Sequence, residues 1–257
     1  MKILVIKCGG SIIDELSHSF FESLKKLKSS GCQLVFVHGG GPDINTMLGK
    51  YEIEPVFEKG LRKTTDEVLN IVELMLSGKS NRSIVHKLSL NGIEAIGLNG
   101  SDGNLLTGDF IDEASLGAVG EIKSVNTELL QMLLNKGISP VLTPIAITEG
   151  GRKLNVNADM AAGAVAKALD AHSCMFVTDV KGVMKDGIII EELTEMQTQN
   201  LISAGSIYGG MIPKVKTALS VLNKGINEVL IVSGKESFFN NGQFIGTKFV
   251  TEQEVLQ

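Results

Sequence analysis

Glycine clusters follow short apolar runs at several places along the chain, and this repeated pattern constrains the fold more than any other feature. Runs apolar at consecutive positions are typical of central strands in a parallel sheet, which are buried on both faces. The runs at 3–6, 34–37, 95–96 and 175–177 precede Lys7-Cys8-Gly9-Gly10, His38-Gly39-Gly40-Gly41, Gly97 and Thr178-Asp179, respectively.

Helical periodicity occupies segments between these runs. The spacing predicts helices over residues 19–30, 128–136 and 158–169, and Gly31 and Gly137 follow two of them as C-terminal caps. Strands alternating with helices predict an α/β fold with right-handed crossovers. Such folds bind ligands at the carboxyl ends of the strands, where the glycine clusters lie.

Composition narrows the classes of function. The chain has 257 residues, a net charge of −5 and 43% hydrophobic residues. These values argue against disorder and against a general binder of nucleic acid or membrane surfaces, which needs a basic surface. The apolar runs are too short for a signal peptide or a membrane span. Because Cys8, Cys32 and Cys174 are widely spaced, we expect free thiols in a cytosolic protein.

Two further segments have a readable local structure. Glu149-Gly150-Gly151-Arg152 predicts a turn between short strands at 146–148 and 153–156, after which Asn157 starts a helix with Asp159 in its first turn. After the start signals Thr64-Thr65-Asp66, the helix from Val68 to Leu76 is apolar on nearly all sides. Burial in a large core and a subunit interface both explain that helix.

Familiar nucleotide and catalytic motifs are absent. Ser77-Gly78-Lys79-Ser80 resembles the end of a P-loop, but Glu73 stands where the first glycine is required. No Gly-x-Gly-x-x-Gly follows the first strand, no ligand spacing for zinc occurs, and no Gly-x-Ser-x-Gly is present. The four histidines are scattered, and we interpret each as structural or solvated.

Four segments nevertheless carry candidate chemistry, and each has a plain structural alternative. The Gly39–41 triplet before a helix can bind an anion through backbone amides. The structural alternative is a flexible turn between strand and helix. Lys214 follows Pro213 in a first helical turn, where a cation opposes the helix dipole unless an anion is bound, or it is a surface lysine. Lys7 is a charge beside a glycine pair at the end of a buried strand, which is typical of a binding site; the alternative is that the strand end is simply solvated. Asn155 alternates with Asn157 and Asp159, where helix capping explains Asn157 but not Asn155.

In this order, the segments resemble the amino acid kinase family. The resemblance spans almost the whole chain, and is nearest to the members that act on N-acetyl-L-glutamate. Its motifs are Lys-x-Gly-Gly-Ser at 7–11, His-Gly-Gly-Gly at 38–41, Gly-Leu-Arg-x-Thr at 60–64, Leu-Gly-x-Val-Gly at 116–120, Asn-Val-Asn-Ala-Asp at 155–159, Thr-Asp-Val-x-Gly-Val at 178–183, Gly-Gly-Met-x-x-Lys at 209–214 and Gly-Thr at 246–247.

The resemblance implies a fold and a reaction. The fold would be an open three-layer αβα sandwich around a mainly parallel sheet of about eight strands. Residues 1–174 would form an N-terminal lobe that binds the amino acid and dimerises, and residues 175–257 a C-terminal lobe that binds ATP. The reaction would be phosphorylation of the γ-carboxylate of N-acetyl-L-glutamate by ATP, giving N-acetyl-L-glutamyl 5-phosphate in arginine synthesis.

The resemblance also implies roles for individual residues. Lys7 and Lys214 would offset charge on the transferring phosphoryl group, and Asp159 would hold both lysines. Mg²⁺ would arrive with ATP and be held by phosphates and water, without dedicated protein ligands. The remaining residues would bind the amino acid (Gly40, Gly41, Arg62 and Asn155) or the nucleotide (Gly9, Gly10, Asp179, Gly182, Gly210 and Met211).

The implied partners and the alternatives complete these expectations. We expect a homodimer through the Val68 to Leu76 helix, and no arginine feedback, because the N-terminal helix of arginine-inhibited relatives has no room here. Neither nucleic acid nor membrane is expected as a partner. Aspartokinases carry regulatory domains for which 257 residues leave no space. Glutamate 5-kinase or carbamate kinase activity remains an alternative, as does a non-catalytic protein on the same fold that binds an anion or nucleotide without turnover.

Overall fold

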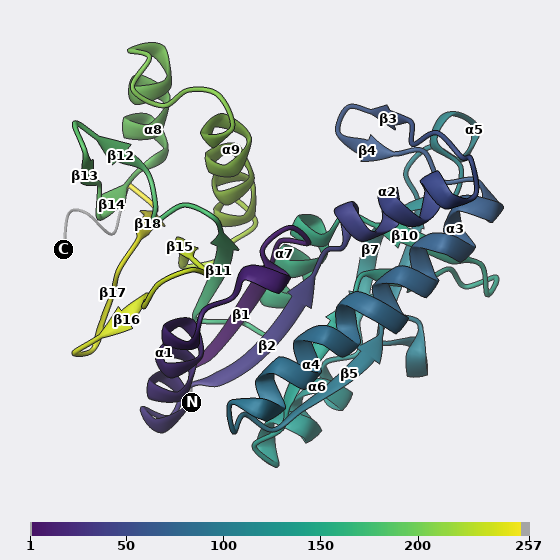
Figure 1. Cartoon of the computed structure of the whole chain (residues 1–257), viewed down its shortest axis with the longest axis horizontal. Helices are drawn as coiled ribbons and strands as arrows, with labels where there is room; N and C mark the ends of the chain where they lie inside the picture. The colour runs from purple at the N-terminus through teal and green to yellow at the C-terminus, as the bar shows by residue number, and fades with distance from the viewer. Residues whose placement is uncertain (1, 253–257) are drawn as a thin grey trace.

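The computed structural model describes residues 2–252, which are built around one eight-stranded sheet (Figure 1). All neighbouring strands in it run parallel except β15 and β18, which are antiparallel. The predicted α/β fold with a mainly parallel sheet is therefore confirmed. In spatial order the strands are β14 (Glu192–Leu193), β18 (Thr247–Val250), β15 (Glu228–Ser233), β11 (Ser173–Thr178), β1 (Ile3–Cys8), β2 (Gln33–His38), β8 (Ser139–Thr143) and β5 (Ala95–Asn99).

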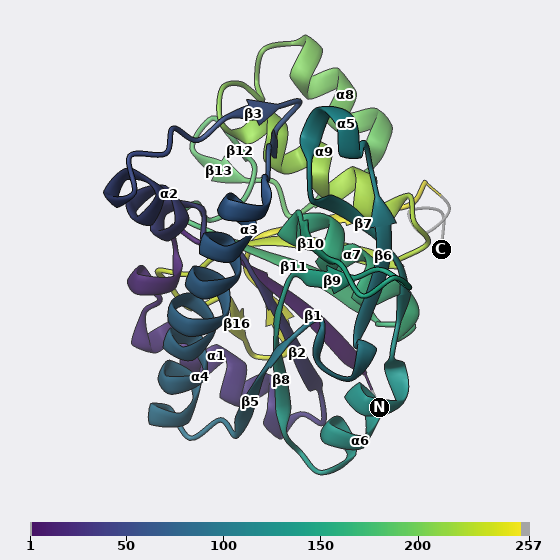
Figure 2. The same cartoon turned by 90° about the vertical axis from the view of Figure 1, so that its right-hand side faces the viewer.

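Helices cover both faces of the sheet and form the outer two of three layers (Figure 2). Because successive strand residues point to opposite faces, Val5 of β1 joins one core and Leu4 and Ile6 join the other. The first core contains residues of α6 (Thr127–Asn135), α7 (Ala158–Ala168) and α9 (Met211–Leu222). The second contains residues of α1 (His18–Ser29) and α4 (Asn81–Leu90).

The predicted helices agree with α1, α6 and α7 to within one residue at each end. The cap signals also act as expected. The Ser17 side chain caps the start of α1, and Gly31 and Gly137 adopt the left-handed backbone, with φ of 88° and 77°, just after α1 and α6. The local sequence therefore determines where these helices begin and end.

One predicted central strand lies at the edge of the sheet. β5 is the last strand in the order, and the Ile96 side chain is 40% exposed. A short apolar run cannot by itself distinguish an edge strand from a central one. The sequence analysis also did not single out β8 and β15, which are fully or almost fully buried. β8 contains Pro140, a residue that usually argues against a central strand.

A second, smaller sheet closes on itself in the order β10, β7, β6, β9. Its strands are β6 (Leu106–Phe110), β7 (Val119–Val125), β9 (Ile145–Ile147) and β10 (Lys153–Val156). β9 and β10 pair antiparallel around the turn predicted at residues 149–152. β10 runs parallel to β7 and leads directly into α7, so this sheet positions the segment from Asn155 to Asp159.

The apolar helix predicted from Val68 to Leu76 is the first part of a longer helical rod. α3 (Asp66–Glu73), which the Thr65 side chain caps, continues through a π-helical segment, η2 (Leu74–Ser80), into α4. Val72, Met75 and Leu76 are buried within the chain, in one cluster with residues of α2 (Gly41–Lys50). Core burial therefore explains most of the apolar surface of this helix, whereas Leu74 is 58% exposed.

No helix among residues 2–252 is long and apolar enough to cross a membrane. The boundary predicted between two lobes, at 174–175, falls inside β11, which pairs continuously with β1 and β15. The remaining elements are short or lie at the periphery. They are η1 (Ile13–Glu15), β3 (Phe57–Glu58), β4 (Leu61–Arg62), η3 (Asp102–Asn104), α5 (Glu113–Leu116), β12 (Met184–Lys185), β13 (Ile188–Ile189), α8 (Glu195–Ser203), β16 (Phe239–Asn240) and β17 (Gln243–Phe244).

Candidate functional site

The carboxyl ends of the parallel strands β1, β2 and β11 bring three predicted segments to one edge of the sheet. The Gly9-Gly10 pair follows β1, the glycine triplet follows β2, and Asp179 follows β11. This placement follows from the topology, because parallel strands end at the same edge. The segments that lie far apart in the sequence are thereby neighbours in space.

The first two glycine segments touch each other. A Cβ atom on Gly10 would lie 2.7 Å from both the Cα and the backbone nitrogen of Gly40. A Cβ on Gly40 would lie 2.7 Å from Leu76 Cδ2 and from Ser80 Oγ. These glycines are therefore required for packing, because a side chain at either position would collide with its neighbours. Gly40 is the N-cap of α2, where the first amides of a helix have no intrahelical partner.

Lys7 and Asp159 form an ion pair at this edge, with Nζ and Oδ1 2.8 Å apart. Lys7 has the strand parity of Val5, so its side chain points toward the face that α7 covers. Asp159 lies in the first turn of α7, where the Asn157 side chain accepts hydrogen bonds from the amides of Asp159 and Met160. The predicted contact between Lys7 and Asp159 is thus present.

Lys214 contacts a different carboxylate from the one that the resemblance implied. Its Nζ lies 2.8 Å from Asp179 Oδ1, and this hydrogen bond lowers the pKa of the Asp179 carboxyl. Both side chains are partly exposed, so such an ion pair is weak and its partners can exchange. Lys214 nevertheless lines one cavity of about 150 Å³ together with Lys7 and Asp159, which we call the lysine cavity.

Arg62 lines a second cavity, and one terminal nitrogen of its guanidinium has no hydrogen-bond partner among residues 2–252. Its Nη2 donates to Asn45 Oδ1 at 2.6 Å, and its Cζ lies 4.6 Å from the centre of the Phe57 ring. Its Nη1 is buried and has no hydrogen-bond partner within residues 2–252. Burial lowers the pKa of the guanidinium. Because an unpaired buried donor costs roughly 1–3 kcal/mol, Nη1 is suited to receive an anionic ligand.

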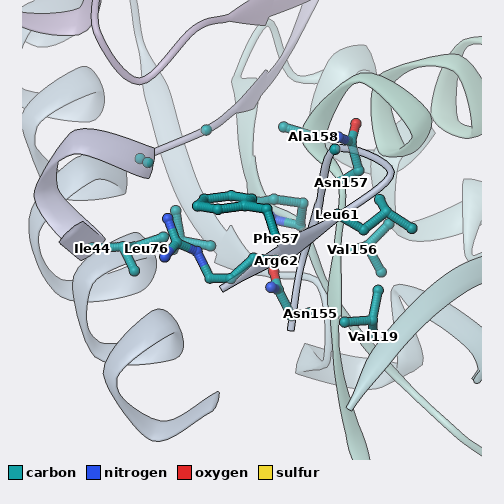
Figure 3. A pocket seen from close by; sticks show the side chains of 15 residues that line it. Ile44, Phe57, Leu61, Arg62, Leu76, Val119, Asn155, Val156, Asn157 and Ala158 are labelled. Carbon is teal, nitrogen blue, oxygen red and sulfur yellow. The ribbon is translucent and has the colours of Figure 1, made fainter. Parts of the chain in front are cut away.

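The cavity around Arg62, which we call the acceptor cavity, has a volume of about 170 Å³ (Figure 3). Gly40, Gly41 and Asn155 line it, as the sequence analysis predicted for a shared site. A third cavity, of about 490 Å³, has Asn157 in common with the acceptor cavity and Asp159 in common with the lysine cavity. The three cavities therefore adjoin one another between the β3–β4 hairpin and α9.

The residues predicted to bind a nucleotide are divided between two places. Gly182 and Met211 line an apolar cavity of about 220 Å³ together with Tyr208, and the backbone of Gly209 is left-handed, with φ of 55°. Gly210 is the N-cap of α9, one turn before Lys214. Gly9 lies beside Lys7, because a Cβ on Gly9 would be 3.9 Å from Lys7 Nζ. The apolar cavity can hold a planar base, and the lysine cavity can hold phosphates.

His38 is structural, as the sequence analysis interpreted it. It is fully buried, its Nδ1 lies 3.0 Å from the Gly39 carbonyl oxygen, and its Nε2 lies 3.1 Å from Asn81 Nδ2. The carbonyl can only accept, so Nδ1 carries the proton and Nε2 accepts from Asn81. Burial lowers the pKa of His38 to about 4. A neutral His38 therefore anchors the glycine triplet to α4.

Three side chains that position Arg62 and Asn155 were not given a role by the sequence analysis. They are Asn45, Phe57 and Thr64, and only Thr64 lies inside a quoted motif. No group of three His, Cys, Asp or Glu side chains within residues 2–252 is placed to hold a metal ion.

Comparisons with known proteins identify the family and support the fold. A model of the amino acid kinase family matches residues 2–233. The chain is 49% identical over 255 residues to the acetylglutamate kinase of Bacillus licheniformis, with 99% of each chain covered. It is 51% identical over 246 residues to that of Halalkalibacterium halodurans, with 95% of each covered. The solved structure of smu.665 from Streptococcus mutans UA159 superposes with a TM-score of 0.83 at 31% identity, covering 96% of this chain and 98% of that chain.

Proposed function

The chain belongs to the amino acid kinase family, and we propose that it transfers the terminal phosphoryl group of ATP to the γ-carboxylate of N-acetyl-L-glutamate in arginine biosynthesis. The product is N-acetyl-L-glutamyl 5-phosphate. The relatives named acetylglutamate kinase match over nearly their whole length, which supports the substrate. The observation that carries the proposal is that a cavity lined by an arginine with an unpaired buried donor and a cavity lined by two lysines each share lining residues with a third cavity.

The acceptor needs no general base in this reaction. A γ-carboxylate with a pKa near 4.3 is already ionised at neutral pH. Its oxygen forms the new bond to phosphorus, while the bond from phosphorus to the bridging oxygen breaks and its electron pair leaves with ADP. The difficulty is to bring two anions together, so catalysis consists mostly of positioning and charge stabilisation.

Lys7 and Lys214 offset that negative charge from two sides of the lysine cavity. Asp159 orients Lys7 through the ion pair already described, and Lys214 exchanges Asp179 for the phosphoryl oxygens when substrates are bound. Backbone amides at Gly9, Gly10 and Gly40 add donors from the two touching glycine segments. Asp159 acts here as an orienting group, because the reaction has no proton for a base to remove.

Arg62 and Asn155 bind the α-carboxylate and the acylated amine of the substrate, with Gly40 and Gly41 at the wall of the same cavity. A guanidinium recognises a carboxylate through charge-assisted hydrogen bonds. The nucleotide binds beyond β11, near Gly182 and Met211 of the apolar cavity, Gly210 at the start of α9, and Asp179. Residues 1–174 thus hold the amino acid and contribute Gly9 and Gly10 to the phosphates, whereas the base and the rest of ATP contact residues after 174.

Mg²⁺ accompanies ATP and, when bound, neutralises phosphate charge. The residues present fit that arrangement, because among the described residues that line the lysine cavity two are lysines and Asp159 alone carries a carboxylate. Phosphate oxygens and water would provide the remaining metal ligands, as is usual for Mg²⁺ bound with a nucleotide.

We also infer a homodimer that uses the outer side of the α3–η2–α4 rod. Five apolar residues between Val68 and Leu76 are buried within the chain, so the support comes from Leu74, which is 58% exposed, and from the neighbouring sheet edge at β5. A sheet edge and an exposed apolar side chain are both features that a second copy covers. The cytosolic location expected from the sequence remains a prediction.

A coupled assay for ADP release from Mg-ATP tests the proposed function. N-acetyl-L-glutamate is compared with L-glutamate, L-aspartate and carbamate, and hydroxylamine traps an acyl phosphate. We expect turnover with N-acetyl-L-glutamate alone. Turnover with another acid would retain the mechanism and replace the substrate, whereas nucleotide binding without any turnover would identify a non-catalytic binding protein.

A further inference from the structure

Thr64 is a fully buried polar residue that links the backbone of Arg62 to the side chain of Asn155, two residues assigned to substrate binding. It lies between β4, which carries Arg62, and the start of α3. Its Oγ1 donates to the carbonyl oxygen of Arg62 at 2.8 Å. The same Oγ1 receives a hydrogen bond from Asn155 Nδ2 at 3.0 Å. One hydroxyl thus connects the β3–β4 hairpin to β10.

The single proton of this hydroxyl determines how the Asn155 carboxamide is turned. The Arg62 carbonyl oxygen can only accept, so it takes the Thr64 proton, and Oγ1 is left to accept from Asn155. Nδ2 of Asn155 must therefore face Thr64. Oδ1 then points away from Thr64 and accepts no hydrogen bond from residues 2–252, while Asn155 lines the acceptor cavity (Figure 3).

The backbone of Thr64 is clamped, which gives the hydroxyl a fixed position. Its amide donates to the Leu116 carbonyl oxygen at 2.8 Å, and its carbonyl oxygen accepts from the Ala118 amide at 2.7 Å. Gly117 lies between them with φ of 70°, and a Cβ there would be 2.3 Å from the Thr64 carbonyl oxygen. The Leu-Gly-x-Val-Gly motif therefore has a structural reason, which is to hold Thr64.

We propose that Thr64 is a positioning residue that makes Asn155 Oδ1 the hydrogen-bond acceptor for the substrate amide N–H. Two residues that line the acceptor cavity then carry polar atoms without a partner among residues 2–252, the acceptor Asn155 Oδ1 and the donor Arg62 Nη1. An N-acyl amino acid carries an amide N–H and a carboxylate on the same carbon, which match this pair. The inference rests on the proposed function for the identity of the substrate. It adds that Thr64 determines which atom of the Asn155 carboxamide faces the substrate.

The test compares N-acetyl-L-glutamate with its ester analogue, (S)-2-acetoxyglutarate, in which oxygen replaces the amide N–H. Calorimetric titration gives a dissociation constant for each ligand. We expect the wild-type chain to bind the amide roughly tenfold more tightly, because one hydrogen bond is lost and an acceptor is left unpaired with the ester. In Thr64→Val, which keeps the shape of the side chain, the carboxamide can turn, and the ratio falls to about 1–2.

Four further variants separate positioning from simple stabilisation. Thr64→Ser keeps the hydroxyl and restores the wild-type ratio. Thr198→Val removes a comparable buried bond, from Thr198 Oγ1 to the Thr194 carbonyl oxygen at 2.8 Å, and leaves the ratio unchanged. Asn155→Ala brings the ratio to the same value as Thr64→Val, and the double variant shows no further change. Asn155→Ala keeps the proposal testable if Thr64→Val does not fold.

The proposal is overturned if Thr64→Val, or Asn155→Ala, keeps the wild-type preference for the amide. It is also overturned if Thr64→Ser loses the preference as fully as Thr64→Val. A wild-type chain that binds N-acetyl-L-glutamate with the expected preference, but does not phosphorylate it, would contradict the proposed function and leave this inference standing.

Discussion

Lys7 at the end of β1 and Asp159 in the first turn of α7 are joined by a 2.8 Å ion pair between Nζ and Oδ1. The pair exists because β1 lies directly beneath α7, and because the alternation along β1 turns Lys7 toward that helix. It places a positive charge at the carboxyl edge of the sheet, where a Cβ on Gly9 would lie 3.9 Å from Lys7 Nζ.

The first prediction concerns this lysine. Lys7→Ala lowers kcat roughly 10²–10³-fold in the coupled ADP-release assay, since one donor to the developing charge is lost. Lys50→Ala, which removes an exposed lysine in the last turn of α2, is the matched control and leaves kcat unchanged. A Lys7→Ala enzyme with wild-type kcat would contradict the role assigned to Lys7.

The second prediction concerns the unpaired donor of Arg62. Arg62→Lys cannot contact Asn45 and the substrate carboxylate together, so KM for N-acetyl-L-glutamate rises roughly 10–100-fold, the equivalent of one charge-assisted hydrogen bond.

Arg152→Lys is the matched control for this change. Arg152 also lies over an aromatic ring, 4.7 Å from the centre of Phe110, and pairs with Glu113, but it is half-exposed and does not line the acceptor cavity. Steady-state kinetics should show a wild-type KM for Arg152→Lys. An unchanged KM in Arg62→Lys would rule out the proposed contact.

The third prediction concerns pH and the buried His38. Burial lowers its pKa to about 4 from an ordinary value of 6.5, so the unfolded chain takes up the proton first as the pH falls. The stability contributed by neutral His38 is fully present above pH 6.5 and is lost as the pH falls toward 4. The expected total is about 3 kcal/mol.

Urea denaturation between pH 7 and pH 5 measures this loss in the range where carboxylates contribute little. His38→Asn should flatten the pH dependence, and His86→Asn, at an exposed position of α4, should retain it. A wild-type free energy of unfolding that does not change between pH 7 and pH 5 would show that His38 is not held neutral.

The fourth prediction compares two glycines. Gly10→Ala places a methyl group 2.7 Å from the backbone of Gly40, so it separates the two glycine segments, lowers stability by about 1–3 kcal/mol and abolishes turnover. Gly49→Ala, within α2 and with open space around it, raises stability by about 0.4–1 kcal/mol and leaves turnover intact. Thermal unfolding and the ADP-release assay decide between these outcomes, and an active, stable Gly10→Ala would refute the required contact.

The fifth prediction concerns assembly. Sedimentation velocity at micromolar concentration should show a dimer for the wild-type chain, and Leu74→Glu should shift it to monomer, because a charge would be buried in the interface. Met132→Glu, at an exposed position of α6 on another face, serves as the control and should remain dimeric. A wild-type monomer would exclude the inferred interface.

The sequence by itself determined the local structure and the chemistry available. Cap residues such as Ser17 and Asn157, and glycines such as Gly31, fix where helices begin and end, because these signals act over a few residues. The ordered motifs likewise indicated the family, since each motif is a short run of neighbouring residues that can be identified from the sequence alone. These features need no knowledge of distant contacts.

Only the tertiary structure decided which strands are central and which side chains meet. The edge position of β5, the burial of most of the helix from Val68 to Leu76, and the pairing of Lys214 with Asp179 all depend on elements that pack together from distant parts of the chain. The same holds for Thr64, whose hydroxyl can accept a hydrogen bond from Asn155 only because the smaller sheet brings Asn155 Nδ2 to 3.0 Å from it. Hydrogen bonds and packing act over ångströms in space, so the order of residues alone does not specify them.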